Sequence, residues 1–226
     1  MQRIFISFIL VFMAIASYGQ EQEFRNGLKF GVGETVVVSD SDMFFPSSKL
    51  NMMIGFSSSF DLLKGMAIQG DIHFSRKGFN VDGKDRAGGL LGSDQEFTNY
   101  YTLNYIELPL FFKPKFASDK FSVFGLIGAS FNFNLGAKYD KRYWDDTYDE
   151  YDLSKQDVSN GLNSFHTAVQ LGYGMDFKLS GNGLFFFDIR HQLSSKDLGF
   201  IQDTNGNNQT IGLRGITFNF GSRYVL

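Results

Sequence analysis

The sequence has 226 residues, and its 21 Lys and Arg against 24 Asp and Glu give a formal net charge of −3 at pH 7. This balance argues against a nucleic-acid-binding protein, because no basic excess is available to neutralise phosphates. The absence of cysteine excludes disulfides, thiolate metal sites and cysteine catalysis. Phe is very common, at 27 residues, so many aromatic rings must lie outside a small globular core.

The first segment, residues 1–19, has the layout of a secretory signal peptide. Arg3 supplies a short positive start, an apolar run follows, and small residues precede a cleavage point before Gln20. Cleavage after Ala16 is a second choice, and an uncleaved anchor is the alternative interpretation. We predict that residues 1–19 are removed and that residues 20–226 form one domain outside the cytoplasm.

The rest of the chain alternates between apolar and polar residues, which is the period of a β-strand and not of a helix. Eight segments show this pattern: 28–38, 50–62, 66–77, 105–113, 121–135, 164–178, 185–194 and 216–226. Their apolar faces are rich in Phe and long enough to cross a bilayer as tilted strands. Their polar faces carry Gly, Ser, Asn, Gln and charges, which suits a narrow, hydrogen-bonded interior.

The connections between these segments alternate between short and long. Residues 62–65, 114–119 and 180–183 are short, whereas residues 39–49, 78–99, 138–163 and 195–210 are long. Outer-membrane barrels have short periplasmic turns and long outer loops, and an open sheet edge is not tolerated in lipid. The sequence therefore predicts an all-β fold: an eight-stranded antiparallel up-and-down transmembrane β-barrel with both termini in the periplasm.

The last strand alternates up to the final residue, as in outer-membrane barrels whose C-terminus is a signal for the assembly machinery. Leu226 stands in place of the usual Phe, and Ser222 interrupts the apolar face. The expected partners are therefore outer-membrane lipid and the barrel-assembly machinery.

Pro109 cannot donate a ladder hydrogen bond, so we predict a bulge or kink near it.

Two segments resemble the PorT-like family of small outer-membrane barrels from Bacteroidetes, which are Gram-negative. Asn104–Phe116, NYIELPLFFKPKF, is similar to that family's "YLEIPLLLK" strand. Ile68–Val81, IQGDIHFSRKGFNV, is similar to its strand with a "YSQKG"-like tail. The resemblance implies an outer-membrane barrel. The founding member of the family is an accessory of a gliding-associated protein secretion system, but no residue carries that role over.

The inward faces of the predicted strands carry charges of both signs, which must pair because unpaired buried charges are costly. We expect Glu107 to meet Lys77 or Lys113, and we interpret the set as a structural lumen network. Its alternative is a small selective or gated passage. The set is Lys29, Asp71, His73, Lys77, Glu107, Lys113, Asp176, Lys178, Asp188 and Arg190.

The third outer loop mixes acidic and aromatic residues, and we interpret it as a solvated loop that is a candidate interaction surface. Its central residues are Tyr143, Trp144, Asp145, Asp146, Tyr148, Asp149 and Glu150. Divalent-ion binding is the alternative, since carboxylates can hold Ca²⁺. Residues 203–208, DTNGNN, lack the Gly and Glu spacing of a calcium loop and fit a tight turn better.

Catalysis has little support in the sequence, which contains no nucleophile elbow, phosphate-binding loop or zinc-protease motif. His166 with Ser164 is the candidate pair for a lipid-modifying enzyme, the least supported alternative.

We therefore predict a non-enzymatic outer-membrane protein without cofactor or metal. It would act as a structural, surface-interaction or secretion-accessory component through its outer loops, with an unknown protein or surface ligand as partner. A narrow, porin-like solute channel is the first alternative.

Overall fold

The computed structural model describes residues 23–39, 46–63, 65–86, 94–143, 151–157, 161–179, 181–194, 199–202 and 208–225. The predicted signal peptide, residues 1–19, lies outside this part of the chain. The described residues form ten strands in one sheet: β1 Phe24–Ser39, β2 Pro46–Leu63, β3 Met66–Arg86, β4 Asp94–Ala117, β5 Phe121–Tyr143, β6 Tyr151–Asp157, β7 Phe165–Lys178, β8 Gly183–Ser194, β9 Gly199–Gln202 and β10 Asn208–Val225.

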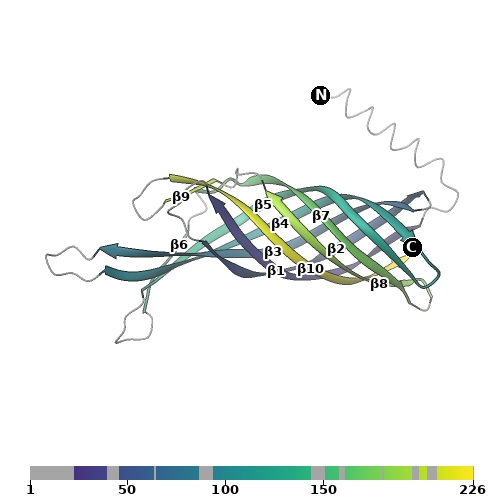
Figure 1. Ribbon diagram of the computed structural model, residues 1–226, viewed down its shortest axis with the longest axis horizontal. Helices are drawn as coiled ribbons and strands as arrows, with labels where there is room; N and C mark the ends of the chain where they lie inside the picture. Colours follow the sequence, from purple (N-terminus) through teal and green to yellow (C-terminus); the bar gives the residue numbers. More distant parts are fainter. Residues whose placement is uncertain are drawn as a thin grey trace, which may run out of the picture.

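Eight of these strands close into a ring, which confirms the predicted eight-stranded antiparallel barrel. The order is β1-β2-β3-β4-β5-β7-β8-β10, and β10 pairs back with β1 in a register that includes Lys29↔Gly221. The short strands β6 and β9 lie off the ring, on β5 and β10. In Figure 1 the strands wind steeply around an elongated barrel, with the C-terminus near one end. At the opposite end, β3 with β4 and β5 with β6 project beyond the ring.

The alternation of the sequence places apolar side chains outside and polar side chains inside the ring. On β1, for example, Leu28, Phe30 and Val32 are exposed, whereas Lys29 is completely buried. Such an arrangement suits a barrel surrounded by lipid, because the outward apolar band replaces the water-facing surface of other proteins. The described residues contain no helix of sufficient length and hydropathy to cross a membrane.

The strands run farther than the sequence pattern predicts, and parts of the predicted long loops are strand. Residues 78–86 and 94–99 belong to β3 and β4, and β5 continues to Tyr143 before β6. The reason is that the pattern inverts at this end of the barrel. Beyond Lys77, the side chains of Phe79 and Val81 are buried inside, so an apolar outer face no longer marks the strand.

The structure shows no bulge at Pro109, whereas the alternative of a local kink stays a prediction. Pro109 pairs with Ser130 of β5 in regular register. On the β3 side, the register is the same before and after it, from Gly70↔Leu110 to His73↔Glu107, and only the two intervening pairs are missing. The missing proline N–H therefore interrupts the ladder locally without adding a residue.

A register shift does occur farther along β4 and β5, where Asn104 pairs with Gly136 and Tyr105 with Asn134, so that Leu135 is left over. Gly136 has a φ of 154°, which favours glycine, and its N–H donates to the side-chain oxygen of Asn134 at 2.9 Å. The extra residue changes which side chains face inward, and Ala137 becomes buried in the interior.

Candidate functional site

The interior of the ring is the candidate site, because polar and charged side chains from every ring strand converge there. Of the ten charged residues that the sequence singles out, nine are buried in this interior. The exception is Lys178, which lies exposed at the end of β7. The buried nine form contacts that fall into three levels along the barrel axis.

The central level is organised around Asp71 of β3, which accepts four hydrogen bonds. Its Oδ2 accepts from Lys29 Nζ at 3.0 Å and from Arg190 Nη1 at 2.6 Å. Its Oδ1 accepts from Ser57 Oγ at 2.6 Å and from Gln69 Nε2 at 3.1 Å. Because every lone pair has a donor, this carboxylate is well compensated for the loss of water.

Arg190 of β8 extends the central level across the ring. Its Nε and Nη2 donate to the two oxygens of Asp188 at 2.7 and 2.9 Å, while Nη1 reaches Asp71. The guanidinium also lies 4.5 Å from the centre of the Phe111 ring. Asn219 of β10 donates to Asp188 at 2.7 Å. One planar guanidinium thus bridges two carboxylates from different strands, a geometry that lysine could not reproduce.

A second level lies nearer the end of the barrel where β1 begins and β10 ends. Asp176 accepts from Lys113 Nζ at 2.9 Å and from Arg223 Nη1 at 3.4 Å. The two cations also lie over aromatic rings, with Lys113 at 3.7 Å from the Phe124 centroid and Arg223 at 3.9 Å from the Phe186 centroid. Such cation–π contacts strengthen when water is excluded.

Arg223 is a central member of this network that the sequence-based set omits. Its Nη2 and Nε donate to Ser57 Oγ at 2.8 and 3.1 Å, and Ser57 in turn donates to Asp71. Ser57 therefore joins the two levels. The signal was present in the sequence, since Arg223 falls on the same inward face as Asn219 and Gly221.

The third level lies toward the end with the projecting strands and is centred on Glu107. Lys77 Nζ lies 2.5 Å from Glu107 Oε1, and His73 Nε2 lies 3.2 Å from Oε2. Ser75 also donates to this carboxylate, and Lys77 donates to Gln192 at 2.8 Å. Glu107 thus meets Lys77, one of its two expected partners, while Lys113 pairs with Asp176 instead.

An apolar cluster covers this third level at the end of the interior. Phe79 and Tyr101 stack with their ring centres 4.6 Å apart, and Tyr139 packs at the margin. We call this cluster the apolar cap. Its buried members are Val37, Phe79, Val81, Tyr101, Leu103, Tyr105, Ala137, Leu162, Ile211 and Leu213.

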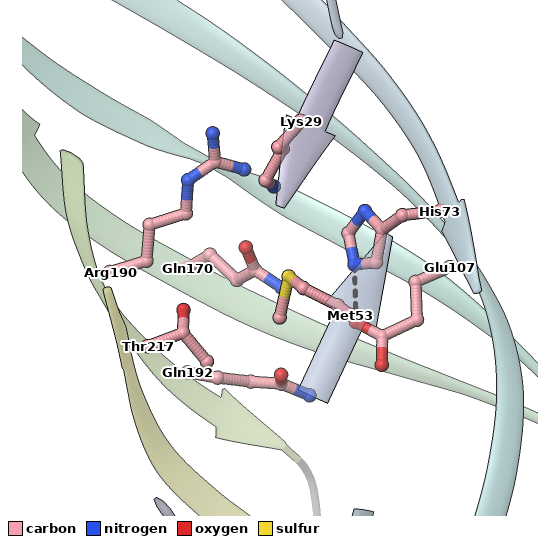
Figure 2. A pocket seen from close by; sticks show the side chains of 8 residues that line it. All are labelled: Lys29, Met53, His73, Glu107, Gln170, Arg190, Gln192 and Thr217. Atoms are coloured by element: carbon pink, nitrogen blue, oxygen red, sulfur yellow. Dashed lines mark hydrogen bonds and ion pairs between the residues drawn. The ribbon is translucent and has the colours of Figure 1, made fainter. Parts of the chain in front are cut away.

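One cavity within the network, among the described residues, is very small. Figure 2 shows the eight side chains that surround it, including Lys29, His73 and Glu107, all pointing into the interior. The cavity measures about 10 Å³, which is room for one water molecule. Gln192 Nε2 and His73 Nδ1 border it without a hydrogen-bond partner in the described residues, so a water there would find polar contacts.

The buried side chains described here carry more positive than negative charge. The cations are Lys29, Lys77, Lys113, Arg190 and Arg223, and the carboxylates are Asp71, Glu107, Asp176 and Asp188. Five basic side chains thus face four acidic ones among these buried residues. Three of the ion pairs, Lys29–Asp71, Arg190–Asp71 and Arg223–Asp176, join strands that are not neighbours in the ring, so they hold the barrel together across its interior.

The other sequence candidates are not assembled into a site. Most of the acidic and aromatic loop lies outside the described residues, namely Trp144, Asp145, Asp146, Tyr148, Asp149 and Glu150. The same holds for residues 203–207, and the side chain of Tyr143 is not described either. His166 is buried edge-on to Tyr105, with a centroid distance of 5.2 Å. Within the described chain, neither of its ring nitrogens has a hydrogen-bond partner, so it is not bonded to Ser164.

Metal-ligating side chains do not gather into a site in the part of the chain that the structure describes. No cluster of three or more His, Asp or Glu suited to a metal occurs among these residues. The carboxylates of the interior are each engaged by cationic side chains instead.

Comparison with solved structures finds other outer-membrane proteins at low sequence identity. OprG from Pseudomonas aeruginosa has a TM-score of 0.48 and 12% identity, over 90% of this chain and 95% of that chain. A major outer membrane protein of Thermus thermophilus has a TM-score of 0.43 and 14% identity, over 88% of this chain and 99% of that chain. Ail, the attachment invasion locus protein of Yersinia pestis, has a TM-score of 0.41 and 14% identity, over 90% of this chain and 99% of that chain.

At the level of sequence, none of the curated proteins matches this chain. A family does match: the one described as "Outer membrane protein beta-barrel domain" covers residues 18–194, most of the chain. This match agrees with the closed ring of eight strands and its outward apolar surface. The chain therefore belongs to the outer membrane protein beta-barrel domain family and is an integral protein of the outer membrane.

Proposed function

We propose that this protein is a non-enzymatic, non-conducting barrel that anchors an interaction surface at the outer face of the membrane. The observation that carries the proposal is the filled interior. Three levels of paired charges and an apolar cap occupy the ring, and the cavity among them holds no more than a water molecule. A hydrated solute would have to break several buried ion pairs to pass, which is energetically costly.

The projecting strands supply the surface. Beyond the last β2–β3 pair, Pro46↔Val81, β3 and β4 continue to pair as far as Arg86↔Asp94. On the other side of β4 lies β5, and the end of β5 pairs with β6 from Lys138↔Asp157 to Tyr143↔Tyr151. These strands form a sheet that extends past the ring, and in the sequence the acidic and aromatic residues 144–150 connect β5 to β6.

The partner that we propose is a protein or a surface ligand that binds this extension. Its acidic residues favour a cationic partner, and its aromatic residues favour one with flat apolar or sugar surfaces. The resemblance of Asn104–Phe116 to the PorT-like strand makes a secretion-system accessory role the first pathway to test. The C-terminal strand is the part that we expect the barrel-assembly machinery to bind during insertion.

Single-channel recording in planar bilayers tests the proposal. Refolded protein with a verified heat-dependent shift in gel mobility should give no reproducible conductance steps. Glu107→Ala is recorded beside it, because this change opens space at the third level without altering the outer surface. Steps in the wild-type protein that change size in Glu107→Ala would overturn the proposal in favour of a narrow solute channel.

A further inference from the structure

The lipid-facing surface of the barrel carries a depression that crosses four neighbouring strands. It measures about 410 Å³ and lies over β10, β1, β2 and β3. Outward-facing apolar side chains form its walls, and Gly31 and Met53, which belong to the inward face, contribute to its floor. The wall residues are Phe30, Val32, Met52, Ile54, Phe74 and Phe220. Its dimensions and apolar lining suit a hydrocarbon chain.

One end of this groove is bordered by a cation. Arg76 lines the depression and pairs with Met52 across β2 and β3. Its side chain is exposed, and within the part of the chain that the structure describes it makes no hydrogen bond or ion pair. An uncompensated guanidinium beside an apolar groove is expensive in lipid unless an anion accompanies it.

Two further cations lie on the same face. Lys49 lies over Gly78 and donates to Thr102 at 3.2 Å, and it is repelled by the charges of both Arg76 and Arg142. Lys49 and Arg142 both face the Tyr100 ring, at 5.8 and 4.8 Å from its centroid. A register shift between Ser48 and Met52 accompanies this placement of Lys49 on the outer side.

Two described carboxylates lie on this face: Asp140, which is 3.6 Å from Arg142, and the exposed Glu34 of β1, which pairs with Leu50 next to the Met52–Arg76 row. Asp140 attracts Lys49 as well, but less strongly than the two arginines repel it. Among these described residues, Arg76, Lys49 and Arg142 thus stand against two carboxylates at the Arg76 end of the groove, which leaves an excess of positive charge. This end is the one toward the projecting strands, opposite to the end where β1 begins and β10 ends.

We propose that this groove binds a phosphate-bearing lipid of the surrounding membrane, with an acyl chain along Phe30, Met52 and Ile54 and the phosphate at Arg76. The apolar walls bury the chain, and the guanidinium donates to phosphate oxygens in the bidentate geometry that arginine favours. Lys49 adds positive potential behind it. The proposal is independent of whether the barrel conducts, because the side chains that would contact the acyl chain and the phosphate, Phe30, Met52, Ile54 and Arg76, face outward.

The test is lipid retention in native mass spectrometry of protein released from nanodiscs of equal parts phosphatidylcholine and phosphatidylglycerol. Wild-type protein should retain phosphatidylglycerol in preference to phosphatidylcholine. Arg76→Gln should lower this retention about tenfold, as expected for the loss of one charge-assisted hydrogen-bonded contact. Ile54→Trp should lower retention of both lipids, because the indole fills the groove.

Arg214→Gln is the matched control, because Arg214 is an exposed, outward arginine on β10 that does not line the groove. All variants must first show the heat-dependent gel shift of a folded barrel. Equal retention of the two lipids by the wild-type protein would overturn the proposal, and so would equal losses in Arg76→Gln and Arg214→Gln. Displacement of the lipid by inorganic phosphate at equal concentration would also overturn it, because the acyl chain would then contribute nothing. A parallel series with lipid A in place of phosphatidylglycerol tells which phosphate-bearing lipid binds best.

Discussion

Glu107 shows how a single side chain can hold several strands of a narrow barrel together. It lies on β4, and it is engaged by Lys77, His73 and Ser75 of β3, while Lys77 continues to Gln192 of β8. The carboxylate is almost fully buried, so its negative charge is stable only with these partners. Removal of the carboxylate would leave the Lys77 ammonium buried without a counter-charge.

Glu107→Ala should therefore destabilise the barrel by about 3–5 kcal/mol, the cost of an uncompensated buried charge. The measurement is the free energy of unfolding from urea titrations in lipid vesicles. Lys178→Ala is the control, because this charge is exposed at the end of β7, and its effect should stay within about 0.5 kcal/mol. The double variant Lys77→Met with Glu107→Ala should lose less than the sum of the single losses. Additive losses would contradict the pairing.

The strands could be predicted from the sequence where contact with lipid requires apolar residues on the outer face. They could not be predicted beyond the lipid-facing band, where that requirement ends. Between Leu28 and Val32 or between Ile216 and Phe220, apolar residues must face outward, so period and face could be assigned. Beyond Lys77 the interior turns apolar and the outer face turns polar. Residues 78–86 therefore resembled a loop, although they are paired strand. The pairing of Asp71 with Arg190 was beyond prediction, since it depends on the register between strands far apart in sequence.

The seam between β1 and β10 depends on a close approach that only glycine permits. A Cβ at Gly221 would lie 2.1 Å from the carbonyl oxygen of Leu28 and 2.7 Å from the Phe186 ring. We expect Gly221→Ala to lower the folded fraction, because overpacking of this kind costs about 1–3 kcal/mol and the backbone contact leaves little room to relax. The measurement is the fraction of protein that shows the folded mobility on an unheated gel after refolding.

The control for this change is Gly70→Ala in β3, where the new Cβ would meet only Leu110 Cδ1 at 3.9 Å, an ordinary contact. This variant should refold as well as the wild-type protein. If Gly221→Ala refolds to the same extent as Gly70→Ala, the seam does not require glycine, and the narrowness of the closure would need another explanation.

At the scale of the whole molecule, two groups of side chains close the interior one after the other along the barrel axis: the charged network and the apolar cap. The charged network fills the part of the barrel inside the outward apolar band, and the apolar cap fills the end beyond it. The network resists a solute because ions must be separated, and the cap resists it because water must enter an apolar space. We expect either closure to be sufficient without the other, so loss of one should not open the barrel.

This arrangement predicts a non-additive result in planar bilayers. Phe79→Ala with Leu103→Ala removes the centre of the cap, and Arg190→Ala removes the side chain that bridges Asp71 and Asp188. Either change alone should leave the barrel silent, whereas the triple variant should show conductance steps, because only then are the cap and the central level of the network both disrupted. Each variant must retain the gel shift of a folded barrel, since cavity-forming changes cost about 2–5 kcal/mol each. Steps in the Arg190→Ala protein with an intact cap would contradict two closures in series and would assign the barrier to the charged network alone.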